Sequence, residues 1–178
     1  GNLYVATGDR AESMNSQSLA NPYGKILRIT PLGTIPPDNP FASTPGADRS
    51  IWALGLRNPF RIAVDSLNGT LWIGDVGGNS FKAWEELERG QAAANFGWPD
   101  AEGFECSSGN CAGFVQPFFA YQHDDEVFAP ATKQGAMIAG PVYRGSAFPP
   151  SFSGNVFFAD YASGWIRRLV RDASGAIV

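Results

Sequence analysis

The sequence has 178 residues, 21 of them glycine and 13 proline, and a formal net charge of −4 at pH 7. A chain of this length can bury the core of one domain, spanning residues 1–178, and its frequent glycines and prolines divide it into short segments that favour an all-β fold. The acidic balance excludes a nucleic-acid partner, because phosphate binding needs a basic patch, and no apolar run approaches the roughly 20 residues that cross a bilayer.

Three stretches along the chain share one pattern: GNLYVATGD from Gly1, GTLWIGDVG from Gly69 and GNVFFADYA from Gly154. Each contains a glycine, a polar residue, a run of strand formers and then an aspartate, and each is followed by a second strand candidate. Repeated strand pairs separated by loops of different length are typical of the blades of a β-propeller. The Asn68–Gly69 pair between two apolar runs predicts a type I′ hairpin turn.

The stretch IWALGLRNPFRIAVD, residues 51–65, holds an arginine, an asparagine and a proline between two runs of strand formers. Pro59 restricts Asn58 to extended backbone, so the Asn58 amide would project in a fixed direction. Arg57 adds a fork of donors that suits a carboxylate or a quinone oxygen. The alternative is an exposed arginine beside an asparagine of an ordinary turn, and the spacing leaves both interpretations open.

The stretch GDVGGNSFKAWEEL, residues 74–87, is the next candidate. Gly77 and Gly78 lack side chains, so a ligand or a hard cation can approach their carbonyl oxygens closely. Asp75, Glu85 and Glu86 are acidic neighbours. A glycine turn flanked by solvated carboxylates would explain the same residues without a ligand.

The two cysteines and the only histidine lie in later loops. Turn-forming residues separate Cys106 from Cys111, so the pair can form a disulfide, as suits an oxidising compartment, or remain as two free thiols. No second cysteine pair or nearby histidine completes a zinc site. His123 lies beside Asp124 and Asp125, which suggests a proton relay, but a lone histidine in a loop is more often structural or solvated.

The ordered motifs LYVATGD, NPYGKILRI, GTIPPDNPF, IWALGLRNPFR, GTLWIGDVG, WEELERG, NFGWPDAEG, AGPVYRG and NVFFADYASGWI resemble the glucose/sorbosone dehydrogenase family. The resemblance covers nearly the whole chain and implies a six-bladed β-propeller of which this chain supplies about half, in a periplasmic or secreted protein. We therefore expect the chain to be part of a longer protein. Otherwise two copies would associate to close the ring, since an open half-propeller exposes blade faces and strand edges.

The resemblance also implies a cofactor and a metal. In the quinoprotein members, an Arg-Asn pair in the motif similar to GLRNP contacts pyrroloquinoline quinone (PQQ), which implies that Arg57 and Asn58 bind this cofactor. The loop similar to DVGGNS supplies backbone carbonyls to the Ca²⁺ that polarises the quinone, which implies Gly77 and Gly78. The family can have proline at the second of these positions, where only the carbonyl is needed.

A second Ca²⁺ is held in some members by a glutamate of the motif similar to WEEL and by the carbonyl beside GWP. This implies Glu86 and Phe96, although the alignment of NSFKAWEEL also allows Glu85. Two departures weaken the catalytic prediction. First, the general base of the family is a histidine upstream of the LYVATGD motif, so no catalytic residue is assigned here and the chain alone is not expected to be active. Second, Ala162 stands where some members have a lysine that contacts PQQ.

The function that the resemblance implies is oxidation of an aldose sugar to its lactone by the full-length protein. Hydride would pass from the anomeric carbon to PQQ, while Ca²⁺ and Arg57 stabilise charge on the quinone oxygen. The resemblance specifies neither the sugar nor the electron acceptor. The alternative is a non-catalytic propeller that binds a protein or carbohydrate partner, like the Hedgehog-interacting type. Ala162 fits this alternative, whereas the retained Arg57 and Asn58 favour the enzyme.

Overall fold

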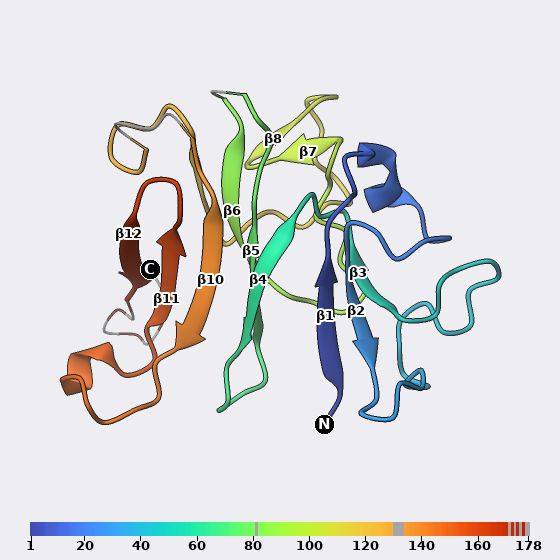
Figure 1. Cartoon of the computed structure of the whole chain (residues 1–178), viewed down its shortest axis with the longest axis horizontal. Helices are drawn as coiled ribbons and strands as arrows, with labels where there is room; N and C mark the ends of the chain where they lie inside the picture. Colours follow the sequence, from blue (N-terminus) through green and yellow to red (C-terminus); the bar gives the residue numbers. More distant parts are fainter. Residues whose placement is uncertain (81, 130–133, 171, 173, 175, 177–178) are drawn as a thin grey trace.

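The computed structural model of the chain describes residues 1–80, 82–129, 134–170, 172, 174 and 176. These residues form three antiparallel sheets that stand side by side as blades (Figure 1). The first sheet contains β1 (Leu3–Thr7), β2 (Lys25–Ile29) and β3 (Ile51–Leu54), the second β4 (Pro59–Val64), β5 (Leu71–Asp75), β6 (Trp84–Arg89) and β9 (Phe119–Gln122), and the third β10 (Met137–Val142), β11 (Val156–Asp160) and β12 (Trp165–Leu169). The predicted all-β, partial β-propeller is confirmed.

Three short elements complete the described chain: the hairpin of β7 (Ala101–Glu102) and β8 (Glu105–Cys106), and the 3₁₀ turns η1 (Ser13–Gln17) and η2 (Pro150–Phe152). No helix among the described residues is long and apolar enough to cross a membrane.

The three repeated stretches form equivalent strands. They are β1, β5 and β11, and each pairs in antiparallel register with the strand that follows it, namely β2, β6 and β12. The aspartates at the ends of these stretches, Asp9, Asp75 and Asp160, therefore lie at or just beyond one edge of their sheets, the upper edge in Figure 1. The repeated sequence pattern therefore marks an equivalent strand in each of the three blades, with an aspartate at or just beyond the end of that strand.

The hairpin between β4 and β5 differs in type from the prediction. A type I′ turn needs positive φ at both central residues, but here only Gly69 has it, at 75°. The loop is longer because Asp65 closes it: the Asp65 carboxylate accepts the N–H of Leu67, and its carbonyl accepts the N–H of Gly69. The hairpin was predicted correctly and its turn type wrongly.

The core consists of two apolar layers, one on each face of the second sheet. Leu71 and Ile73 of β5 pack toward the first sheet, against Ile26 and Trp52, while Trp72 packs toward the third sheet, against Met137. Successive residues of a strand point to opposite faces, and both faces of this sheet are covered. A strand buried on both faces is expected to contain an uninterrupted apolar run, as residues 71–73 do.

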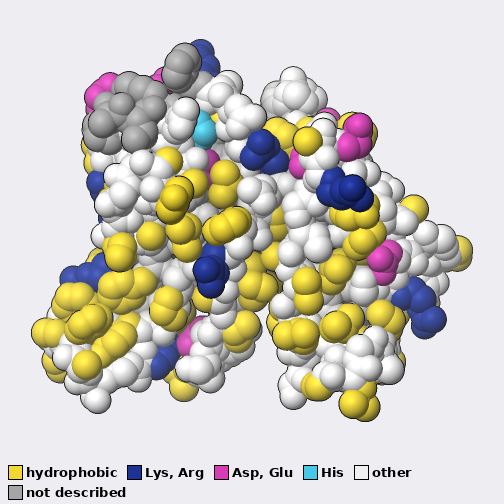
Figure 2. Space-filling model, in the orientation of Figure 1, with side chains coloured by type: hydrophobic (Ala, Val, Ile, Leu, Met, Phe, Trp, Pro, Cys, Tyr) yellow, Lys and Arg dark blue, Asp and Glu magenta, His cyan; other side chains and the backbone are white. Residues whose placement is uncertain are grey.

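Figure 2 shows hydrophobic side chains gathered at the lower end of the third sheet. Tyr143, Phe148, Phe152 and Phe157 pack against one another there. Offset and edge-on contacts between aromatic rings stabilise such clusters beyond the burial of their area. This packing fixes the end of the blade opposite to the edge that carries Asp160.

Lys25 anchors the loop that follows β1. Its side chain is fully buried, and the ammonium group donates to the carbonyls of Asn15, Ser16 and Tyr23 at 2.7, 3.0 and 2.6 Å. Burial lowers the pKa of Lys25 from 10.5 to about 8, against the opposing effect of the Asp48 charge. One buried cation therefore ties residues 15–23 to β2.

Replacing Lys25 with methionine should destabilise the fold by about 1–3 kcal/mol at pH 7, because three carbonyls lose their donor. The folded-state pKa of Lys25 lies below the unfolded value, so the unfolded chain holds more protons between pH 8 and 10.5, and the wild-type protein gains stability as the pH rises through this window. Lys25→Met lacks that gain. Urea denaturation should therefore show the stability difference between the two proteins widening from pH 8 to pH 10.5, and a constant difference would contradict the prediction.

Candidate cofactor and metal site

The backbone of Arg57 and Asn58 is held by one buried carboxylate. The N–H of Arg57 donates to Asp75 Oδ2 at 2.9 Å, and the N–H of Asn58 donates to Asp75 Oδ1 at 2.6 Å. Asp75, the last residue of β5, is 1% exposed. Burial raises the pKa of Asp75 to about 7, although the two N–H groups oppose the rise. The position of the Arg-Asn pair is thus set by the end of the neighbouring strand.

The side chain of Arg57 lies between two loops. Its Nη1 donates to the Val76 carbonyl at 3.0 Å, and its guanidinium carbon lies 5.7 Å from the centre of the Trp98 ring. The Trp98 indole N–H in turn donates to Asp9 Oδ2 at 3.0 Å. Since a guanidinium has five N–H donors, this fixed side chain can still donate to an anionic ligand.

Three adjoining cavities line the upper edge of the sheets. The first, of about 360 Å³, is bounded by Gly8, Asp9, Arg10, Ala11, Arg57 and Asn58. The second, of about 300 Å³, shares Asp9, Ala11 and Arg57 with it and extends to Gly78, Asn79 and Trp98. The third, of about 260 Å³, shares Gly78 and Asn79 and reaches Gly77 and His123. The structure therefore brings the Arg-Asn pair and the glycine loop into one depression.

The glycine loop presents two unused carbonyls. The N–H of Gly77 donates to Glu85 Oε1 at 3.2 Å, and the N–H of Gly78 donates to Glu102 Oε1 at 2.6 Å. A Cβ on Gly77 would lie 1.9 Å from the Trp84 carbonyl oxygen, so only glycine fits there. Among the described residues, none donates a hydrogen bond to the carbonyl of Gly77 or Gly78. Two carboxylates thus occupy the donors of the loop and leave its oxygens, the ligand type that Ca²⁺ prefers, available.

Glu85 connects this loop to His123. Its carboxylate is fully buried and accepts, besides the N–H of Gly77, the ring Nε2 of His123 at 2.9 Å and the N–H of Met137 at 2.6 Å. Burial raises the pKa of Glu85, and these hydrogen bonds oppose the rise. Burial lowers the pKa of His123, but the hydrogen bond and charge of Glu85 outweigh it and raise the value overall. His123 is 4% exposed, so it is not solvated, and its hydrogen bond to Glu85 places it below the glycine loop on the lining of the third cavity.

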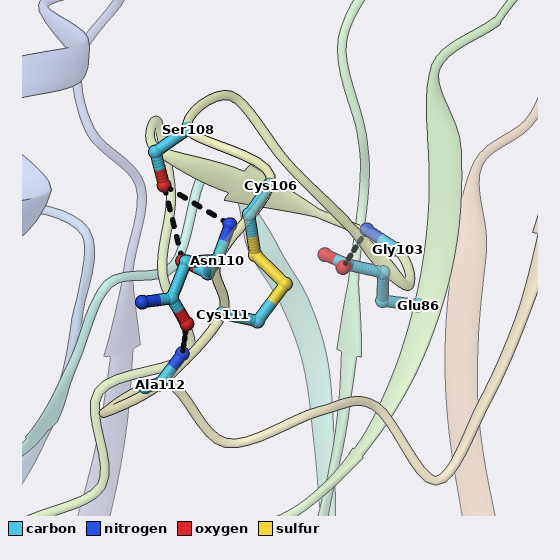
Figure 3. Close-up of a disulfide and its surroundings, with 7 residues drawn as sticks. All are labelled: Glu86, Gly103, Cys106, Ser108, Asn110, Cys111 and Ala112. Atoms are coloured by element: carbon cyan, nitrogen blue, oxygen red, sulfur yellow. Dashed lines mark hydrogen bonds between the residues drawn. A yellow bond between two sulfur atoms is a disulfide. The ribbon is translucent and has the colours of Figure 1, made fainter.

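Glu86 points to the opposite face of β6 from Glu85, because adjacent residues of a strand alternate. Its Oε1 accepts the N–H of Gly103 at 2.6 Å (Figure 3). Phe96, 4% exposed, packs in the apolar layer that also contains Ile73, on this same face, and its carbonyl accepts no hydrogen bond from the described residues. Because Glu86 and Phe96 lie on one face of β6 and Glu85 lies on the other, Glu86 is the better candidate to bind the predicted second Ca²⁺ together with the Phe96 carbonyl.

In the described part of the chain, no group of three or more His, Cys, Asp or Glu side chains is arranged to hold a metal ion. A cation bound at either predicted position would need backbone carbonyls as ligands. The two predicted donor sets, Gly77 with Gly78 and Glu86 with Phe96, both include such carbonyls and remain predictions.

The cysteines form the disulfide that their spacing allowed. Cys106 and Cys111 are bonded with Cα atoms 5.5 Å apart, close to the β7–β8 hairpin that carries Glu102 and Gly103 (Figure 3). The disulfide therefore constrains a segment that contacts both Gly78 and Glu86. Ala162 lies in the turn between β11 and β12.

Several residues that line or support the site were not predicted from the sequence as site residues, among them Asp9, Asn79, Trp98 and Glu102. Asp9 and Trp98 lie within the recognised motifs LYVATGD and NFGWPDAEG, so their motifs were a usable signal. Glu102 lies in the same motif as Trp98, but its contact with Gly78 joins residues 24 positions apart and could not be read from the motif.

Glu102 should act as a positioning residue for the glycine loop. Replacing Glu102 with leucine removes the acceptor of the Gly78 N–H and should weaken Ca²⁺-dependent ligand binding about tenfold, in line with the loss of one charge-assisted hydrogen bond. Glu102→Gln keeps an amide oxygen at this place and should restore most of the affinity. Isothermal titration calorimetry on both variants is the measurement, and equal losses in the two would contradict a positioning role.

Comparison with known proteins gives consistent matches. The family model described as Glucose / Sorbosone dehydrogenase matches residues 1–178. The aldose sugar dehydrogenase YliI of Escherichia coli K12 is 33% identical over 136 residues, which cover 71% of this chain and 36% of that protein. The HIPL2 protein of Arabidopsis thaliana is 29% identical over 190 residues, covering 90% of this chain and 26% of that protein.

A solved structure agrees with these matches. The PQQ-bound form of the aldose sugar dehydrogenase from Streptomyces coelicolor has a TM-score of 0.70 at 27% identity, over 98% of this chain and 43% of that chain. The chain thus spans less than half the length of each of these three proteins.

Proposed function

The chain belongs to the glucose/sorbosone dehydrogenase family, and we propose that it forms the cofactor-binding face of a PQQ-dependent enzyme that oxidises an aldose sugar to its lactone. The observation that carries this proposal is the row of three adjoining cavities that brings Arg57 and Asn58 together with the Gly77–Gly78 loop, whose carbonyls accept no hydrogen bond from the described residues. An anionic, planar cofactor with a bound cation needs this combination of fixed donors and carbonyl oxygens.

In this proposal each residue has a defined task. Arg57 and Asn58 would bind PQQ by donating hydrogen bonds to its oxygens, and Gly77 and Gly78 would hold Ca²⁺ through their carbonyls. Asp75 fixes the Arg-Asn pair from below through its two accepted N–H groups. When bound, PQQ accepts the hydride and Ca²⁺ polarises its carbonyl.

The test is a calorimetric titration of PQQ into the chain with Ca²⁺ present. Saturable binding that is lost when a chelator removes Ca²⁺ would support the proposal. Absence of binding in the wild-type chain under these conditions would contradict it.

A second candidate function is a non-catalytic propeller that binds a protein or carbohydrate partner. The match to HIPL2 and the alanine at position 162 favour this candidate. The retained Arg57 and Asn58, with both backbone amides held by Asp75, favour the PQQ enzyme. The PQQ titration separates the two.

The compartment follows from the same proposal. A disulfide between Cys106 and Cys111 is typical of proteins that fold in an oxidising environment, which supports a periplasmic or secreted protein.

We also propose that the chain self-associates through the outer faces of its first and third sheets. Leu3 on β1 and Ile166 on β12 point away from the two core layers and are 54% and 76% exposed. Pairing these faces between two copies would bury them and close a ring. Sedimentation equilibrium should give a mass above that of one chain, and Leu3→Glu combined with Ile166→Glu should return it to the monomer. A monomeric wild-type mass would refute the association.

A further inference from the structure

Glu88 is a buried carboxylate to which the described residues offer no hydrogen-bond donor. It lies on β6, its side chain is fully buried, and neither of its oxygens has a hydrogen-bond partner among the described residues. A buried charge that is neither paired nor hydrogen-bonded carries a large desolvation penalty. Such a carboxyl group avoids this penalty either by staying protonated or by binding a cation as a carboxylate.

The surroundings of Glu88 are acidic. It shares a face of β6 with Glu86, two residues away, and Asp75 lies opposite Glu86 in the register of β5 and β6. Among the described residues, no lysine or arginine forms an ion pair with Glu86 or Glu88. Several acids therefore lie close together without a basic side chain to neutralise them.

The same face offers further oxygens. The Phe96 carbonyl belongs to a residue of the apolar layer on this side and is not hydrogen-bonded by the described residues. The carboxylate of Glu86 points toward the β7–β8 hairpin, where it accepts the N–H of Gly103 (Figure 3). Ca²⁺ takes six to eight oxygen ligands, and carboxylates and carbonyls are its usual protein ligands.

We propose that Glu88 is a ligand of the second Ca²⁺ site, beside Glu86 and the Phe96 carbonyl. This inference rests on the proposed function and extends its Ca²⁺ binding to the second site that the family resemblance implies at Glu86 and Phe96. Two carboxylates would neutralise the charge of one Ca²⁺ and give the orphaned oxygens of Glu88 the partner they lack. The site would stabilise the packing of the first sheet against the second, because Glu86 and Glu88 lie on β6 and the N–H of Phe96 donates to the carbonyl of Leu54 on β3.

The experiment measures Ca²⁺ binding without PQQ. Ca²⁺ is titrated by calorimetry into the wild-type chain, Glu86→Gln, Glu88→Gln and the control Glu105→Gln, an exposed glutamate of β8. The melting temperature of each is followed with and without Ca²⁺, since a ligand of the folded state raises it. We expect Glu88→Gln and Glu86→Gln each to weaken Ca²⁺ binding at least tenfold and to reduce the thermal shift, while Glu105→Gln resembles the wild type.

The outcomes separate the two levels of the proposal. If Glu86→Gln weakens binding and Glu88→Gln does not, the second site stands and Glu88 is not its ligand. If Ca²⁺ neither binds nor stabilises the wild-type chain, the site is absent and Glu88 is not a ligand. This conclusion holds whether or not the chain binds PQQ in the separate titration. Glu88→Asp provides a second variant in case Glu88→Gln fails to fold. It keeps the charge on a shorter side chain and should bind Ca²⁺ more weakly than the wild type but more tightly than Glu88→Gln, and a folded aspartate variant with wild-type affinity would also count against Glu88 as a ligand.

Discussion

Replacing Arg57 with alanine should weaken PQQ binding more than tenfold, a loss of about 1.5–3 kcal/mol, as expected for a charged hydrogen bond. The Arg57 side chain is already fixed by the Val76 carbonyl and lies against Trp98, so little of its binding energy is spent on ordering it. Calorimetric titration of PQQ in the presence of Ca²⁺ measures the effect.

Two further variants sharpen this test. Arg61→Ala removes an exposed arginine of the same strand segment and should leave the affinity unchanged. Arg57→Lys keeps the charge but loses the planar fork, so it should recover only part of the affinity. An Arg57→Ala protein that binds PQQ as tightly as the wild type would leave Arg57 with a structural role only.

Replacing Asp75 with alanine should have the largest effect on folding, about 2–4 kcal/mol of unfolding free energy, because two backbone N–H groups lose their shared acceptor in the interior. Asp75 holds Arg57 and Asn58 at 2.9 and 2.6 Å, so the variant should also lose PQQ binding. Urea denaturation measures the stability.

Asp75→Asn distinguishes the hydrogen bonds from the volume of the side chain. An asparagine side chain has an oxygen that accepts hydrogen bonds and an NH₂ group that only donates, so it can satisfy only one of the two N–H groups. The free energy of unfolding of the Asp75→Asn protein should therefore lie between those of the wild type and Asp75→Ala. Asp100→Asn, at an exposed position, is the matched control and should unfold like the wild type. An Asp75→Ala protein of wild-type stability would mean that Arg57 and Asn58 are held by other contacts.

The roles of the acidic residues show how far local sequence can reach. Adjacent glutamates in WEEL look alike in the sequence, and the alignment left Glu85 and Glu86 as alternatives. In the sheet they point to opposite faces: Glu85 binds Gly77 and His123 on one side, and Glu86 binds Gly103 on the other. The choice depends on which face meets which neighbouring blade, and this is a property of the packed sheets.

In the turn after β4, too, the local sequence and the contacts of the folded chain determine different features. Asn68–Gly69 correctly indicated a hairpin, because a glycine that accepts positive φ between two apolar runs is a local signal. The type of the turn was set by the side chain and carbonyl of Asp65, which close a wider loop. Local propensity located the turn, and the contacts of one buried aspartate determined its form.

The sequence by itself determined the all-β class and the three repeated strand pairs, because strand periodicity and turn residues are local properties of the chain. Its ordered motifs also singled out Arg57, Asn58, Gly77 and Gly78 as candidate site residues. Only the tertiary structure decided how these residues are held. Asp75 meets the Arg-Asn pair from 17 and 18 residues away, Glu102 meets Gly78 from 24, and His123 meets Glu85 from 38. Hydrogen bonds between such distant residues form only when the sheets pack, so no local pattern encodes them.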